Sequence, residues 1–120
     1  MQKLILFINI LIIFASVNAQ VITSDPQVPV TNQAVTITFY ANEGNGELAG
    51  YTGNVYAHTG LITENSTGPT NWKYVKTDWV ENTAETKLTR LDNDVYTLEI
   101  GPGIRDYYGA PEDEDILKLA

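Results

Sequence analysis

Short runs in which apolar and polar side chains alternate recur along this chain, and turn-forming residues separate them. Residues 35–40, VTITFY, and residues 95–100, VYTLEI, show this alternation and are rich in β-branched and aromatic side chains. A period of two indicates half-buried β-strands, because successive side chains of a strand point to opposite faces. After residue 20, no segment sustains the 3.6-residue period of an amphipathic helix. The chain is therefore expected to fold mainly from strands.

The turn-forming residues indicate how the strands are connected. Asp92-Asn93-Asp94 has the composition of a hairpin turn, and Ile104–Tyr108 is expected to form one helical turn closed by Gly109. Turn signals recur about every 8–12 residues, as in an antiparallel immunoglobulin-like β-sandwich, and this all-β fold class is our prediction. The other expected strands cover residues 54–62, 72–75 with a continuation at 79–80, 88–91 and 116–120.

The sequence of residues 1–19 has the pattern of a signal peptide. Residues 4–15 are almost entirely apolar, and Val17 and Ala19 occupy the positions that signal peptidase reads. A stretch of about 12 residues is too short to cross a bilayer core as a helix. We therefore expect cleavage, a domain at residues 20–120, and a product that is secreted or held at the cell surface. The alternative is an uncleaved membrane anchor.

The last residues, Ile116 to Ala120, begin as an apolar strand and then stop. A strand that ends inside a core leaves backbone groups without partners. Two interpretations follow: a short terminal strand, or a fragment of a longer polypeptide whose last strand is truncated. We expect the fragment.

Net charge narrows the set of partners. Residues 20–120 carry six basic and fifteen acidic side chains, a net charge of −9, because only Lys3 of the seven basic residues lies in the predicted signal. Nucleic acid and anionic membrane surfaces both require a basic face. We expect neither as a partner, whereas a neutral sugar or a cation is compatible with such a surface.

Residues that could carry catalysis are sparse. The sequence has no cysteine, a single histidine, His58, and no serine in a Gly-x-Ser-x-Gly turn. The lack of cysteine excludes a thiol nucleophile and disulfides, and favours a bacterial exported protein. Residues 92–94 and 112–115 offer oxygen ligands that suit calcium, but a hairpin turn and a solvated acidic loop account for them better. We predict no enzyme activity of this chain, no cofactor and no metal site.

The placement of the aromatic residues is the one pattern that indicates a ligand. Tyr56 and His58 point the same way from one expected strand, Trp72 and Tyr74 share a face of the next, and Trp79 follows. Flat, rigid rings stack on the apolar faces of sugars at low entropic cost. The alternative is that one tryptophan fills the sandwich core and that the other rings pack across strands. The polar partners nearby in the sequence are Asn71, Lys73 and Lys76.

The stretches NVYAHTGLIT (54–63) and NWKYVKTDWVE (71–81) resemble the strand-and-tryptophan element of small starch-binding sandwich modules. Together with LDNDVYTLEIGPGIRDYYG (91–109), they make the chain similar to the sandwich domain at the N-terminus of secreted α-amylase-family proteins of the Bacteroidetes. The resemblance implies an accessory module ahead of a downstream catalytic domain of the same polypeptide. It assigns ligand stacking to Tyr56, His58 and Trp72.

We therefore expect a non-catalytic, α-glucan-binding module of a secreted glycan-degrading protein. The residues expected to bind the ligand are Tyr56, His58, Trp72 and Trp79. The alternative is a structural immunoglobulin-like spacer that packs on a catalytic domain and binds no soluble ligand. The spacer predicts that both tryptophans are buried, or covered only by the neighbouring domain.

Overall fold

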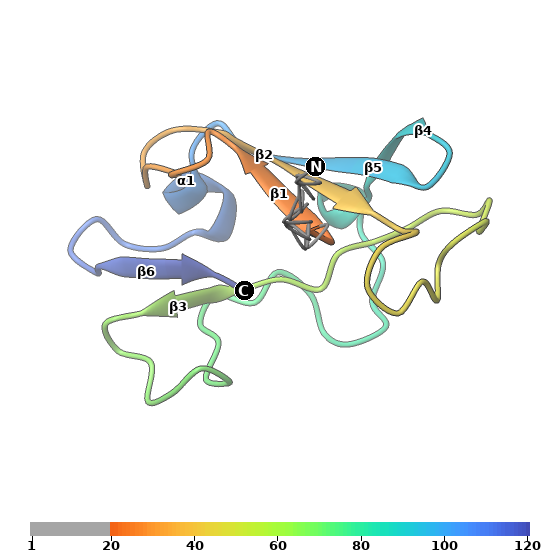
Figure 1. Ribbon diagram of the computed structural model, residues 1–120. Helices are drawn as coiled ribbons and strands as arrows, with labels where there is room; N and C mark the ends of the chain where they lie inside the picture. Colours follow the sequence, from red (N-terminus) through yellow and green to blue (C-terminus); the bar gives the residue numbers. More distant parts are fainter. Residues whose placement is uncertain (1–19) are drawn as a thin grey trace, which may run out of the picture.

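The computed structural model describes residues 20–120, so the predicted signal peptide lies outside the described residues. The described part folds into two antiparallel sheets with little helix, which confirms the predicted all-β sandwich (Figure 1). Its elements are β1 (Ile22–Asp25), β2 (Val35–Tyr40), β3 (Leu61–Thr63), the 3₁₀ turn η1 (Ala84–Thr86), β4 (Thr89–Asp92), β5 (Val95–Ile100), α1 (Ile104–Tyr108) and β6 (Ile116–Leu119).

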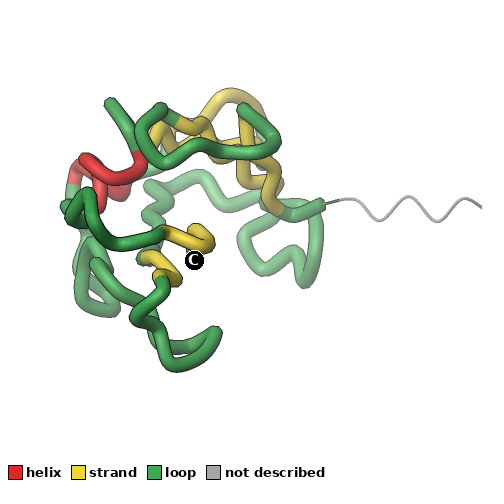
Figure 2. Tube along the Cα trace, turned by 90° about the vertical axis from the view of Figure 1, so that its left-hand side faces the viewer, coloured by secondary structure: helices red, strands yellow, loops and turns green. Residues whose placement is uncertain are grey.

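The order of the strands is that of an immunoglobulin-like fold. The larger sheet has the order β1-β2-β5-β4, and the smaller sheet pairs β3 with β6. Numbered along the chain, these are the A-B-E-D sheet and the C-F pair of the constant-type immunoglobulin sandwich. Within residues 20–120, no strand pairs with the second edge of β6. Figures 1 and 2 show the two sheets as separate layers, with α1 beside one end.

The larger sheet is built from the patterns that the sequence displays most clearly. β2 and β5 pair without a break in register, from Val35 opposite Ile100 to Tyr40 opposite Val95. The β4–β5 hairpin closes at Asp94, whose left-handed backbone (φ 59°) suits a two-residue turn. The predicted hairpin is thus confirmed, with β4 one residue later in the chain than expected.

The predicted helical turn is also confirmed. α1 ends at Gly109, which has a left-handed backbone (φ 73°), and the Gly109 N–H donates to the Arg105 carbonyl at 2.9 Å. Arg105 is buried, and its guanidinium donates to the carbonyl oxygens of Pro111 and Glu114. The helix is therefore fastened to the segment that leads into β6. No helix of residues 20–120 is long and apolar enough to cross a membrane.

The core lies between the two sheets and contains neither tryptophan. The buried aromatic residues of its two clusters are Tyr96 and Tyr108, so neither tryptophan fills the core as the alternative expected. The main buried cluster consists of Val35, Leu61, Leu98, Ile100, Ile104, Tyr108 and Ala110, and a second one of Ala41, Val55 and Tyr96.

Two expected strands are shorter than their sequence pattern indicates. Of residues 54–62, only the end belongs to β3, and Tyr56 makes an isolated bridge with Lys87. The reason is the neighbouring segment, because the 3₁₀ turn η1 directly precedes Lys87 and limits the pairing to residues 55–57 opposite 86–88. Residues 72–75 likewise make one bridge, between Lys73 and Leu61.

Candidate functional site

The expected aromatic residues lie on the side of residues 55–61 that faces away from the core. Val55, Thr59 and Leu61 are buried, as the alternation of this segment predicts. Tyr56 and His58 alternate with them and are only partly buried. The period of two therefore places these two rings together on the outer face.

His58 lies between the two tryptophans of the chain. Its ring centroid is 5.6 Å from that of Trp72, with the planes inclined by 34°, and 4.9 Å from that of Trp79, with the planes perpendicular. Such tilted and edge-on contacts are the favourable arrangements of aromatic rings. The Nδ1 atom of His58 is buried and makes no hydrogen bond within residues 20–120.

An open hollow of about 480 Å³ lies against these three rings, and we call it the aromatic hollow. Its lining residues are His58, Thr70, Asn71, Trp72, Val75 and Trp79. A smaller hollow of about 170 Å³ adjoins it, shares His58 and Trp79 with it, and is lined by Tyr56. The four residues expected from the sequence are thus brought together, with Tyr56 in the neighbouring hollow.

Trp72 is held by its own loop and by a close approach to the strand beside it. Its indole N–H donates to the Pro69 carbonyl at 3.2 Å. A Cβ atom at Gly60 would lie 3.1 Å from the Lys73 carbonyl oxygen and 3.3 Å from the Trp72 Cβ. Glycine at position 60 therefore lets the tryptophan segment lie directly against the start of β3.

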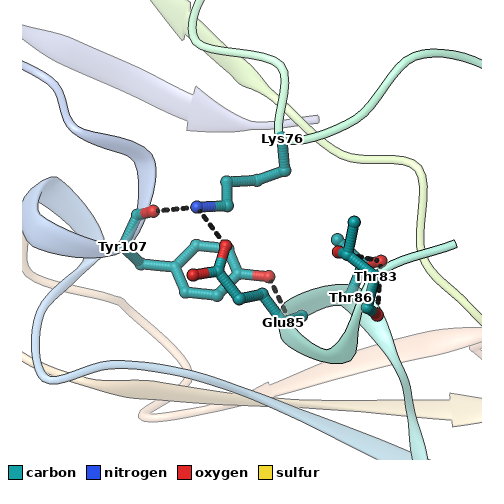
Figure 3. Close-up of polar contacts among 5 residues, drawn as sticks. All are labelled: Lys76, Thr83, Glu85, Thr86 and Tyr107. Atoms are coloured by element: carbon teal, nitrogen blue, oxygen red, sulfur yellow. Dashed lines mark hydrogen bonds and ion pairs between the residues drawn. The ribbon is translucent and has the colours of Figure 1, made fainter. Parts of the chain in front are cut away.

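Trp79 lies on a turn between Lys76 and Glu85, which form an ion pair. Figure 3 shows the contacts of these two residues with Tyr107. Before the turn, Lys76 Nζ donates to the Tyr107 carbonyl at 2.7 Å and pairs with the Glu85 carboxylate at 2.8 Å. Glu85 follows the turn, and its carbonyl oxygen accepts a hydrogen bond from the Tyr107 hydroxyl at 2.7 Å. Burial, with the neighbouring Tyr108 and Glu85, raises the pKa of Tyr107 to about 12, so its hydroxyl remains a donor at physiological pH. Trp79 itself is 73% exposed.

Tyr74 does not share a face with Trp72, contrary to expectation. Its backbone is left-handed (φ 51°), and its ring packs against the core cluster instead of the aromatic hollow. Val75, which an uninterrupted strand would place on the opposite face, lines the hollow in its stead. Thr70 and Val75 are therefore site residues that the sequence did not indicate.

The Tyr74 hydroxyl donates to Glu114, a carboxylate that is only 6% exposed. The same carboxylate accepts from the Thr63 hydroxyl at 2.7 Å and from the Asn65 amide at 2.8 Å. These hydrogen bonds, that of Tyr74 foremost, hold the pKa of Glu114 below its ordinary value of 4.5, while burial opposes them. Glu114 is thus an ionised anchor that joins the loop before β6 to the segments around β3.

The lowered pKa of Glu114 predicts an acid-sensitive fold. A carboxyl group whose pKa is lowered by folding stabilises the protein fully above its unfolded-state pKa, and this contribution disappears as the pH falls through the folded-state value. We expect the urea midpoint to decrease below about pH 4.5, and Glu114→Gln to remove part of that decrease. Glu99→Gln, at an exposed position of β5, is the control. If the urea midpoint decreases equally in Glu114→Gln and wild type as the pH is lowered, the lowered pKa of Glu114 is not a source of the acid sensitivity.

The remaining candidate residues have mixed outcomes. Asn71 lines the aromatic hollow, whereas the amino group of Lys76 is turned to Tyr107 and Glu85. In the described part of the chain, no group of three or more His, Asp or Glu side chains is arranged to hold a metal ion.

Fold and site together define an immunoglobulin-like β-sandwich with a partly exposed aromatic cluster next to its smaller sheet. No protein-family model and no curated protein matches the chain.

Proposed function

We propose that this chain is a non-catalytic carbohydrate-binding module for α-glucans, and that the aromatic hollow binds the sugar. The observation that carries the proposal is the arrangement of His58 between Trp72 and Trp79 beside an open hollow. A row of rings with one face open to solvent offers apolar surface to the C–H faces of pyranose units. Thr70 and Asn71, at the rim, supply polar groups for sugar hydroxyls.

The shape of the cluster favours an α-glucan over a flat polysaccharide. The ring planes of Trp72 and Trp79 are inclined to that of His58 by 34° and 90°, so the rings form a bent surface instead of a level one. α-1,4-linked glucose chains curve, whereas β-1,4-linked chains are extended and flat. A bent surface matches consecutive residues of the curved chain better.

Charge and composition support the same proposal. A net charge of −9 on residues 20–120 suits a neutral ligand better than a polyanion. The predicted signal peptide fits export to the place where polysaccharides are found, as a part of a glycan-degrading protein. The resemblance of residues 54–63 and 71–81 to starch-binding modules points in the same direction.

Native affinity electrophoresis tests the proposal with polymeric ligands. Soluble starch in the gel should retard the protein, whereas hydroxyethyl cellulose and xylan at the same concentration should not. The mobility of bovine serum albumin in the same gels controls for viscosity. Equal mobility with and without starch, for protein shown to be folded by circular dichroism, would refute starch binding.

An exposed apolar surface favours the second candidate, a spacer that packs on a catalytic domain. Trp79 is 73% exposed, and the adjacent Val80 is 84% exposed. Contiguous apolar surface of this kind is typical of protein–protein contacts. The spacer requires the two tryptophans to be covered by another domain, so sugar binding by the isolated chain distinguishes the two candidates.

A further inference from the structure

The segment that carries Trp72 leaves the regular ladder just after Lys73. The backbone groups of Lys73 and Leu61 bond to each other, with N···O distances of 2.7 and 2.8 Å, as a regular antiparallel pair. Two residues on, a regular ladder would bring the Val75 N–H to the Thr59 carbonyl. That carbonyl instead accepts from the Lys76 N–H at 3.0 Å. One extra residue is therefore inserted, which makes this a β-bulge.

Tyr74 provides the left-handed residue of the bulge (φ 51°). An L-residue with a bulky side chain rarely adopts this conformation, and glycine is the usual residue there. Such a conformation persists only where surrounding contacts hold it, and it concentrates at functional sites. We therefore looked for the contact that stabilises the left-handed conformation of Tyr74 and for the effect of the bulge on the site.

The consequence of the bulge is that Trp72 and Val75 line the same hollow. In an uninterrupted strand, side chains three positions apart point to opposite faces. The extra residue restores them to one face, and it turns the Tyr74 ring to the core side. Without the bulge, either Trp72 or Val75 would no longer line the aromatic hollow.

The Tyr74 ring packs against the core, and its hydroxyl donates a hydrogen bond to Oε2 of Glu114. The other carboxylate oxygen, Oε1, accepts from Thr63 and Asn65, so the acceptor is fixed from a second side. Glu114 is forty positions away in the sequence and does not line the aromatic hollow. Its effect on the site would therefore be indirect, and Tyr74 is its hydrogen-bond partner nearest in sequence to Trp72 and Val75.

We propose that Glu114 and Tyr74 are positioning residues of the aromatic hollow: their hydrogen bond holds the left-handed bulge that sets Trp72 and Val75 side by side. The effect on sugar affinity rests on the proposed function, whereas the effect on the position of Trp72 does not. The experiment therefore needs one readout of each kind.

The first comparison removes one hydroxyl. Tyr74→Phe should weaken maltoheptaose binding about tenfold, equivalent to about 1.4 kcal/mol. It should also shift the indole N–H resonance of Trp72, assigned with Trp72→Phe, in protein without sugar. Tyr96→Phe removes a tyrosine hydroxyl that is hydrogen-bonded to Arg90 and to the Tyr51 carbonyl and does not line the aromatic hollow; it is the matched control and should leave both readouts unchanged.

The second comparison separates the bulge from simple packing of the ring. Tyr74→Gly and Tyr74→Ala both delete the ring and the hydrogen bond, but only glycine adopts a positive φ without strain. The glycine variant should therefore keep the Trp72 resonance and the affinity closer to wild type than the alanine variant does. Equal losses in the two variants would overturn the inference.

The two proposals fail in different ways. If wild type binds no maltoheptaose, but Tyr74→Phe shifts the Trp72 resonance and Tyr96→Phe does not, the proposed function fails and the positioning inference is supported. If folded Tyr74→Phe leaves both the resonance and the affinity unchanged, the positioning inference is wrong, whatever the ligand is.

Discussion

Leu61→Ala should lower the free energy of unfolding by about 2–5 kcal/mol, the cost of truncating a buried leucine that leaves a cavity. Leu61 is fully buried in the main core cluster, and it pairs with Leu119 on one side and Lys73 on the other. The loss of its side chain would therefore leave a cavity in the core cluster between the sheets. Chemical denaturation, followed by circular dichroism, measures the effect.

Leu117→Ala provides a control with the same chemical change. Leu117 lies in β6, beside the strand that contains Leu61, but it is 61% exposed. Its truncation should change the free energy of unfolding by no more than about 0.5 kcal/mol. Comparable losses in the two variants would show that the core does not lie between the sheets as described.

Trp72→Ala should weaken maltoheptaose binding by about thirtyfold or more, the effect expected when a central aromatic contact worth about 2 kcal/mol is removed. Trp72 lines the aromatic hollow, contacts His58, and is fixed by its hydrogen bond to the Pro69 carbonyl. A ring that is already oriented loses little entropy on binding. Isothermal titration calorimetry measures the change in affinity.

Tyr51→Ala is the matched control for this variant. Tyr51 is an exposed aromatic residue that lines neither the aromatic hollow nor the adjoining one. Its removal should leave the affinity unchanged. If Trp72→Ala is folded and binds as wild type does, the aromatic hollow is not the sugar site.

The parts of the fold that were predictable from the sequence depend on local patterns. β2, β5, the Asp94 turn and the Gly109 helix end each follow from side-chain alternation or from the left-handed preference of one residue. The shortness of β3 was not predictable in this way. It depends on η1, a turn more than twenty positions later that limits the pairing of Tyr56 to a single bridge.

The candidate site was predictable where it follows the strand period and unpredictable where it breaks that period. Alternation alone brought His58 and Tyr56 to one face, and proximity in the sequence indicated Trp72 and Trp79. The bulge at Tyr74 reverses the period, and no glycine marks it. What holds it is Glu114, a residue distant in the sequence, so the roles of Val75 and Glu114 emerge only from the folded chain.

The most direct measurement of the central claim is a tryptophan fluorescence titration of residues 20–120 with maltoheptaose, with cello- and xylo-oligosaccharides as controls. Both tryptophans border the aromatic hollow, so a sugar bound there must alter their environment. We predict a saturable change with maltoheptaose and none with the other two sugars. No change with any of the three, from a chain shown to be folded, would contradict the α-glucan-binding account and favour the spacer.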